Sequence, residues 1–197
     1  MSAADQHDSQ ANPWITHRRR EVYQNAWIDV RESEVTTPGD TPGIYGVVHY
    51  KHRAVGVVPI DDSEHTWLVG QYRYPTDTYE WEIPEGGARF DEALEDCARR
   101  ELREETGLEA AHYELLLGDL QLSNSVSDER AHLFVARGLK VGTAEPEETE
   151  QLQLRRLPLS EAYAMVQRGE IRDAMSVIAL QCLQLRGSEQ DRQEALT

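Results

Sequence analysis

Apolar residues recur at helical spacing in the stretch GGARFDEALEDCARRELREETGL, which runs from Gly86 to Leu108. Asp91 stands where a helix N-cap belongs, and Gly107 stands where a left-handed C-cap belongs. The pattern therefore predicts a helix from about Glu92 to Thr106. Its apolar stripe consists of Ala93, Leu94, Cys97 and Ala98.

Alternating apolar and polar residues predict strands on the N-terminal side of this helix. Residues 21–36 and 44–50 are interpreted as the two strands of a ribbon, joined by the turn-rich stretch TPGDTPG. Because so small a ribbon is marginal by itself, we expect it to pack on another surface. The next predicted elements are a hairpin-like pair, 53–60 and 66–72, about the turn 61–63, then a short strand, 79–83, and a sharp loop, 84–87, leading toward the helix.

After the helix, strands and helices alternate without a regular βαβ repeat. Such an order suits an α/β (α+β) fold in which a mixed sheet lies between helices. Ser160 opens the first late helix and Gly169 closes it. The predicted elements are strands over 112–122, 130–137 and about 151–157, and helices over 160–168 and 171–185.

The two ends of the chain, residues 1–13 and 187–197, have the composition of disordered tails. Between them we expect an N-terminal antiparallel β-region over 14–50 and a larger domain over 51–186. The length of 197 residues is enough for one domain with a sizeable core and an appendage.

Composition excludes several classes of protein. No apolar run reaches the roughly 18 residues of a membrane span, and the start MSAADQHDSQ is too polar for a signal peptide, so we expect a cytoplasmic protein without a membrane partner. The net charge of −16 disfavours binding of nucleic acid. A small phosphorylated substrate could still bind, because metal ions and a few local arginines set the electrostatic field inside a cleft. Cys97 and Cys182 lie in predicted helices and are interpreted as small buried hydrophobes rather than a disulfide or metal pair.

Three glutamates interrupt the inward face of the central helix. Glu101, Glu104 and Glu105 share the azimuth of its apolar stripe, at about 100° per residue. They repel one another, and they lie at the helix end where the macrodipole disfavours anions. Clustered carboxylates suit Mg²⁺ or Mn²⁺ held partly by substrate phosphates. The alternative is a solvated acidic helix end, in which Arg100 relieves part of the repulsion by pairing with Glu104.

Nine residues at fixed spacing resemble the Nudix box, the motif of the Nudix hydrolases. The resemblance implies an α/β/α sandwich with a mixed sheet over about residues 50–185. It also implies hydrolysis of a pyrophosphate that links a nucleoside to another group. The matching residues are Gly86, Glu92, Arg100, Glu101, Leu102, Glu104, Glu105, Gly107 and Leu108.

The resemblance also implies roles for residues in and near the box. Arg100 and Glu92 would orient the metal-binding carboxylates by ion pairing and hydrogen bonds. Glu82 would flank the site, together with Glu129 at the end of SNSVSDE. The implied metal ligands are Glu101, Glu104, Glu105 and the carbonyl of Glu85.

Within the family, the chain is most similar to enzymes that split ADP-ribose and other nucleoside diphosphate sugars. In those relatives a glutamate on a late loop acts as general base, and here Glu148 and Glu150 are the candidates. A plain acidic surface loop is the alternative. Arg73 resembles an arginine used near the phosphates, with a surface ion pair as its alternative. Trp27 or Tyr23 would stack on a base, unless they are simply core aromatics.

The expected activity is metal-dependent cleavage of ADP-ribose or a related nucleotide sugar to a nucleoside monophosphate and a sugar phosphate. Asn124 stands where ADP-ribose enzymes tend to carry a proline, so GDP-mannose or another nucleotide sugar is the alternative substrate. A non-catalytic nucleotide-sugar sensor is the alternative from a different class. Because the relatives exchange the N-terminal region between subunits, we expect a homodimer whose interface includes residues 14–50.

Overall fold

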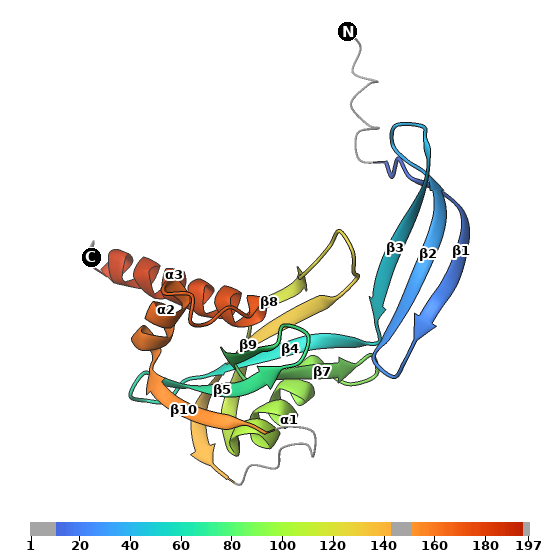
Figure 1. The fold of residues 1–197 in the computed structure, drawn as a ribbon. Coiled ribbons are helices and arrows are strands. Elements are labelled where there is room, and N and C mark those ends of the chain that lie inside the picture. Colours follow the sequence, from blue (N-terminus) through green and yellow to red (C-terminus); the bar gives the residue numbers. More distant parts are fainter. Residues whose placement is uncertain (1–10, 143–150, 195–197) are drawn as a thin grey trace. The chain divides into compact units, whose positions relative to one another are not determined.

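The computed structural model describes residues 11–142 and 151–194 (Figure 1). The chain forms two compact units, Met1–Lys51 with Ser123–Asp128, and His52–Leu122 with Glu129–Thr197. The strands are β1 (Ile15–Gln24), β2 (Ile28–Thr36), β3 (Pro42–Tyr50), β4 (His52–Pro59), β5 (His65–Arg73), β6 (Thr78–Glu82), β7 (Glu85–Arg89), β8 (Leu108–Gln121), β9 (Arg130–Val141) and β10 (Gln153–Pro158). The helices are α1 (Leu94–Thr106), α2 (Leu159–Gln167) and α3 (Ala174–Glu194).

The first unit is a three-stranded antiparallel sheet in the order β1-β2-β3. The expected two-stranded ribbon was wrong because residues 15–24, rich in arginine, form a further strand along β2. The loop between β8 and β9 belongs to this unit. It is fixed to β3 by a hydrogen bond from the Tyr45 hydroxyl to the Ser125 carbonyl, at 2.6 Å, and by contact of His49 with Asp128.

The second unit contains two sheets, β7-β4-β9-β8 and β10-β5-β6. The first sheet is mixed because β4 and β9 run parallel, whereas β7 and β8 pair antiparallel with their neighbours. Helix α1 packs against β4, β7 and β8, and α3 packs against β4, β8 and β9 (Figure 1). The unit is therefore the α/β/α sandwich with a mixed sheet that the sequence predicted.

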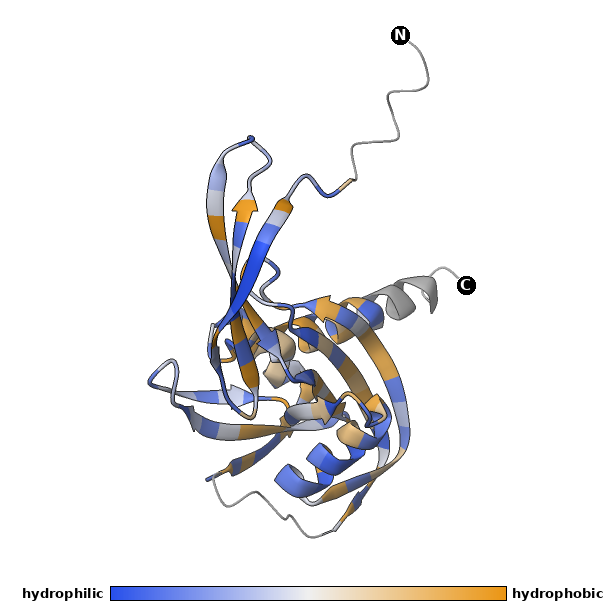
Figure 2. Ribbon diagram, turned by 90° about the vertical axis from the view of Figure 1, so that its right-hand side faces the viewer, coloured by the Kyte–Doolittle hydropathy of each residue, from blue (hydrophilic) through white to orange (hydrophobic). Residues whose placement is uncertain are grey.

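Strand β4 contributes side chains to both layers of the core. Val55 and Val57 belong to the cluster beneath α1, and Val58 belongs to the cluster that contains residues of α2 and α3. This alternation follows from the period-two geometry of a strand. Gly56 lies between Val55 and Val57 in the strand. A Cβ added there would come 2.8 Å from Ile83 Cδ1, so only glycine permits the close packing at this point. The solvent face of α1 is hydrophilic (Figure 2).

Several predicted boundaries differ from the structure for local reasons. The segments 53–60 and 66–72 form no hairpin ladder, because β4 and β5 belong to different sheets and meet only at the isolated bridge between Ile60 and Thr66. The expected loop at 84–87 is the start of β7, which pairs with β4. The glycine-rich sequence EGGAR of β7 has no alternation of apolar and polar residues that would predict a strand. It forms a strand because it pairs with β4.

The helix ends also depart from the predictions. Asp91 does not cap α1; the N-cap position is Ala93, which is exposed and makes no side-chain cap, while Asp91 pairs with Arg89. Gly107 is the left-handed C-cap as predicted, with φ of 69°. Pro158 rather than Ser160 precedes α2. Helix α3 continues to Glu194, so most of the expected C-terminal tail from residue 187 is helical.

Neither cysteine forms a disulfide, and both lie in helices as expected, Cys97 buried and Cys182 partly buried. No helix within residues 11–142 and 151–194 is both long and apolar enough to cross a membrane. The expected tail over residues 1–13 lies largely outside the described residues.

Candidate active site

The C-terminal half of α1 carries the three glutamates that the helical wheel places inward. Glu101 and Glu105 are buried, and Glu104 is partly exposed. Strand β7 runs beside this face, and a Cβ at Gly86 would overlap the carboxylate of Glu101. A residue without a side chain is therefore required on β7 for the Glu101 carboxylate to occupy its position.

Arg100 holds this acidic face together. Its Nη1 donates to Glu101 Oε1 at 2.6 Å and to Glu104 Oε2 at 3.1 Å, and its Nε donates to Glu92 Oε1 at 3.1 Å. Burial opposes the charge of Arg100, but hydrogen bonding to Glu92 and the charge of Glu101 outweigh it and raise its pKa. Arg100 therefore stays charged and fixes the orientation of the neighbouring carboxylates.

A second acidic group comes from three separate elements. Glu82 ends β6, Glu85 begins β7, and Asp173 directly precedes α3. Each offers a carboxylate oxygen within 4.8 Å of the others. Asp173 Oδ2 also accepts the backbone N–H of Ser176 at 2.7 Å, so the start of α3 fixes this carboxylate.

Arg73, at the end of β5, neutralises part of this group. Its Nε donates to Glu82 Oε1 at 2.9 Å, and its Nη2 donates to Glu82 Oε2 at 2.6 Å and to Glu85 Oε1 at 3.0 Å. Burial disfavours the Arg73 charge, yet the Glu82 hydrogen bonds and the charge of Glu85 raise its pKa. The guanidinium is thus fixed in the site by charge-assisted hydrogen bonds.

Glu85 joins the two acidic groups. Its backbone N–H donates to Glu105 Oε2 at 3.1 Å. Its own Oε2 is buried and has no hydrogen-bond partner among the described residues. Burial, followed by the charges of Asp173 and Glu82, raises the pKa of Glu85 well above its ordinary value. A buried carboxylate oxygen without a donor is a position where a cation would be stabilised.

The donor set fits a hard divalent cation. Every candidate ligand is an oxygen, either of a carboxylate or, for the Glu85 ligand that the resemblance implies, of a backbone carbonyl. Mg²⁺ and Mn²⁺ prefer oxygen ligands of both kinds. Among the described residues, the carboxylates outnumber the three arginines that pair with them, Arg73, Arg100 and Arg103. Glu82, Glu85 and Asp173 lie close enough together to hold a metal ion. The further candidates are the three glutamates of α1, Glu101, Glu104 and Glu105.

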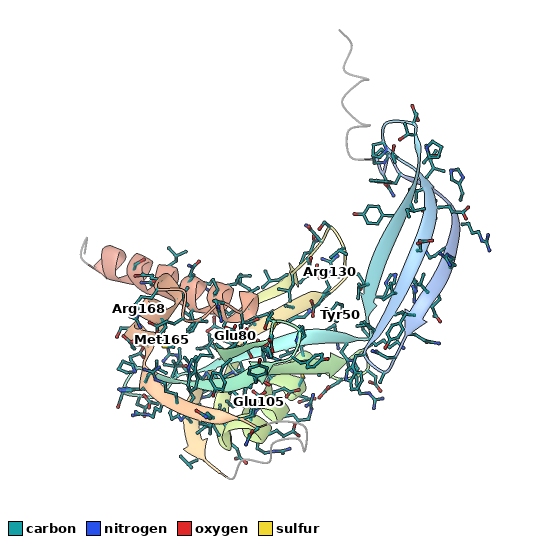
Figure 3. The ribbon with its side chains drawn as sticks, viewed as in Figure 1. Tyr50, Glu80, Glu105, Arg130, Met165 and Arg168 are labelled. Atoms are coloured by element: carbon teal, nitrogen blue, oxygen red, sulfur yellow. The ribbon has the colours of Figure 1, made fainter. Side chains whose placement is uncertain are left out.

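An open cavity of about 320 Å³ adjoins the second acidic group. Arg73, Glu85 and Asp173 line it, and so do Glu80 of β6 and Arg172 before α3. Figure 3 shows the side chains of this unit, with Glu80 and Glu105 labelled. The cavity therefore brings cationic and anionic groups together beside the candidate metal ligands.

The family model described as "NUDIX domain" matches residues 50–178, well over half of the chain. The chain belongs to the Nudix family. A second model, described as "Nucleoside diphosphate sugar hydrolase N-terminal domain", matches residues 14–48 of this Nudix protein.

The Nudix protein also resembles individual proteins. It is 32% identical over 173 residues to the methanol dehydrogenase activator of Bacillus methanolicus, covering 87% of this chain and 92% of that one. It is 34% identical over 161 residues to the ADP-ribose pyrophosphatase of Mycobacterium tuberculosis, covering 79% of this chain and 76% of that one. The crystal structure of an ADP compounds hydrolase superposes with a TM-score of 0.80 at 24% identity, over 91% of this chain and 96% of that one, which supports the fold.

The structure brings together most of the predicted site residues in the Nudix unit. Glu82 lies beside Glu85, and its main contact is Arg73. Glu129 is partly buried, and burial, with the charge of Asp173, raises its pKa. Glu148 and Glu150 lie outside the described residues, so their role stays a prediction.

Tyr23 and Trp27 belong to the first unit rather than the Nudix unit. Both side chains are exposed, with Trp27 68% exposed, so they are not core aromatics of the first unit. Their stacking on a base stays a prediction.

Three residues of the site were not predicted from the sequence: Glu80, Arg172 and Asp173. Glu80 alternates with Glu82 on β6, and this acidic pair on a strand was a usable signal. Arg172 and Asp173 form a charged pair just before a helix, which is typical of a helix start and gave no reason to expect a place in the site.

Proposed function

We propose that the protein is a metal-dependent hydrolase that cleaves the pyrophosphate bond of ADP-ribose or a related nucleoside diphosphate sugar. The products are a nucleoside monophosphate and a sugar phosphate. One observation carries the proposal. Glu85 contacts both the buried Glu105 of the Nudix box and Arg73, and Glu85 and Arg73 line an open cavity. The matches to a nucleoside diphosphate sugar hydrolase N-terminal domain and to an ADP-ribose pyrophosphatase support this substrate class.

The residues of α1 would hold the metal. Glu101, Glu104 and Glu105 supply the ligands, and Arg100 keeps two of them in place. A bound Mg²⁺ would neutralise charge on the diphosphate and lower the pKa of a bound water. Mn²⁺ offers the same chemistry with the same oxygen ligands.

Arg73 is the residue placed to bind phosphate. Glu82 fixes one edge of its guanidinium, and its Nη1 makes no hydrogen bond to any described residue. A guanidinium held in this way offers its remaining donors to phosphate oxygens without having to be ordered first.

The remaining roles rest on the family resemblance. Glu148 or Glu150 would take the proton of the attacking water. Trp27 or Tyr23 would stack on the base of the nucleotide, and Glu129 would contact the substrate. The cytoplasmic location and the homodimer are part of the same proposal.

A turnover assay tests the function. The full-length protein is incubated with Mg²⁺ and a panel that includes ADP-ribose, ADP-glucose, UDP-glucose and GDP-mannose, and the released nucleoside monophosphate is measured. We expect turnover with ADP-ribose or another member of the panel, and loss of turnover when EDTA removes the metal. GDP-mannose is included because Asn124 replaces the proline typical of ADP-ribose enzymes. Tight binding of these compounds without hydrolysis would instead establish the sensor alternative.

A further inference from the structure

Arg172 is a second guanidinium in the cavity. It lies two residues before α3, and its Nε and Nη2 donate to the two carboxylate oxygens of Glu80, at 3.1 Å and 2.5 Å. The Glu80 side chain is 10% exposed, whereas the Arg172 side chain is 56% exposed. A buried carboxylate therefore holds an arginine that is more than half exposed.

Arg172 repeats the arrangement of Arg73. Glu80 and Glu82 lie two residues apart on β6, so their side chains point to the same face of the strand. Each glutamate accepts hydrogen bonds from Nε and Nη2 of one arginine. In both arginines Nη1 makes no hydrogen bond to the described residues, and both side chains line the same cavity.

Glu80 is itself fixed before any ligand arrives. The hydroxyl of Thr78 donates to Glu80 Oε1 at 2.6 Å. The carboxylate therefore holds Arg172 in one orientation, and less conformational entropy is lost when the guanidinium binds an anion. Two fixed guanidiniums suit a ligand with two linked anionic groups, which is the chemistry of a diphosphate.

We propose that Arg172 is a substrate-binding residue that forms, with Arg73, a two-arginine clamp for the phosphate oxygens of a diphosphate. Glu80 is the positioning residue that holds Arg172. This inference rests on the proposed function and adds to it a specificity determinant outside the Nudix box.

Arg168 provides a matched control. It is also tied to two glutamates, Glu161 and Glu170, with distances of 2.8 Å and 2.6 Å. It does not line the cavity. Loss of Arg168 removes the same charge four residues earlier in the chain and leaves the clamp intact.

The first experiment measures KM and kcat of Arg172→Ala with the best nucleotide sugar, and the dissociation constant of magnesium pyrophosphate by calorimetry. We expect both KM and the dissociation constant to rise by about tenfold or more, with a smaller change in kcat, because a charge-assisted contact to phosphate is lost. Arg168→Ala should stay within about twofold of the wild type. Arg172→Lys keeps the charge but lacks the planar guanidinium, so its KM and its dissociation constant should lie between those of the wild type and those of Arg172→Ala. This variant also tests the clamp if the alanine variant does not fold.

The second experiment tests the role of Glu80. Glu80→Gln removes the charge that holds Arg172, so KM should rise less than in Arg172→Ala. The double variant should bind no more weakly than Arg172→Ala, since Glu80 acts through Arg172. Independent, additive effects would overturn the positioning role.

The outcomes separate the clamp from the proposed function. A folded, active Arg172→Ala enzyme with wild-type KM and pyrophosphate affinity would overturn the clamp and leave the hydrolase intact. A wild-type protein that hydrolyses no nucleotide sugar would overturn the proposed function, whereas pyrophosphate affinity that falls in Arg172→Ala but not in Arg168→Ala would still support the clamp.

Discussion

Glu101 and Glu105 are buried carboxylates on one face of one helix, and this arrangement is costly without a cation. Neighbouring like charges on a helix destabilise it by about 0.2–0.5 kcal/mol per pair even when exposed, and more when partly buried. Arg100 offsets part of this repulsion through Glu101 and Glu104. The positions are therefore better explained by chemistry than by stability.

Replacing Glu105 or Glu101 by glutamine should lower kcat by several orders of magnitude, because the change removes charge that holds the metal and keeps the shape of the side chain. The thermal midpoint should be unchanged or higher, since repulsion is relieved. Activity at saturating Mg²⁺ and thermal unfolding are the measurements. Glu95→Gln, on the exposed face of α1, is the control and should keep wild-type activity. Near wild-type turnover by Glu105→Gln would remove Glu105 from the ligand set.

Gly86 is the backbone counterpart of these carboxylates. Gly86→Ala should destabilise the protein by about 1–3 kcal/mol, since the added Cβ overlaps the Glu101 carboxylate and displaces it. Metal-dependent activity should fall as well. Chemical denaturation and Mg²⁺ titration check both effects. The control is Gly46→Ala, where an added Cβ meets nothing within 4 Å and stability should change little. A stable, fully active Gly86→Ala enzyme would contradict the close packing of β7 on α1.

At the scale of elements, the late loop between β9 and β10 carries a separate prediction. Glu148→Gln or Glu150→Gln should lower kcat and change the pH–rate profile, because one of them is expected to take the proton of the attacking water. Metal affinity should stay near the wild-type value, in contrast to the α1 variants. Steady-state kinetics across pH, with Mg²⁺ titrations at each value, separate the two effects. If neither variant alters the profile, the base lies elsewhere in the site.

Elements with a strong local pattern could be predicted from the sequence. The α1 helix has apolar spacing and a C-terminal glycine, and the box residues Glu101 and Glu105 lie where the wheel placed them. Strand β7 could not be predicted in this way, because EGGAR has no alternation and becomes a strand only by pairing with β4. Residues 187–194 contain no large apolar side chain, yet they continue α3.

The second acidic group shows why part of the site escaped prediction. Glu82 is separated from Arg172 and Asp173 by about half of the chain. Nothing in the sequence around either site indicates that these residues lie together in the fold. Their meeting depends on α3 packing against the sheet, where Ser176 Oγ accepts the backbone N–H of Ile83 at 2.9 Å. Such tertiary contacts carry no local sequence pattern. The family resemblance supplied Glu82 and Arg73, but it supplied neither Arg172 nor Asp173.

At the scale of the whole molecule, the first unit exposes apolar side chains that its own sheet does not cover. Ile15, Tyr23, Trp27 and Ile44 are each more than half exposed. Exposed apolar surface of this kind is typical of protein–protein contacts. This composition favours the homodimer, because a two-fold contact would cover the same surface on both subunits.

We therefore expect the intact protein to be a dimer at micromolar concentration, with residues 14–50 in much of the interface. Light scattering on the full-length chain is the measurement. Deletion of residues 1–50 should give a monomeric or aggregating protein with poor substrate affinity, although every Nudix-box residue is retained. A monomeric full-length protein would rule out this assembly, and Tyr23 and Trp27 would then have no partner subunit to reach.

The parallel pairing of β4 with β9 has a consequence for how the chain acquires its structure. β4 ends at Pro59, and its partner begins only at Arg130, so the central ladder joins residues that are far apart in sequence. Loop-closure entropy makes such pairing slow. During synthesis α1 emerges from the ribosome well before β9, and its apolar face has to wait for the completed sheet. Folding of the Nudix unit is thus expected to be limited by the arrival of β9 rather than by formation of the helix that carries the Nudix-box glutamates.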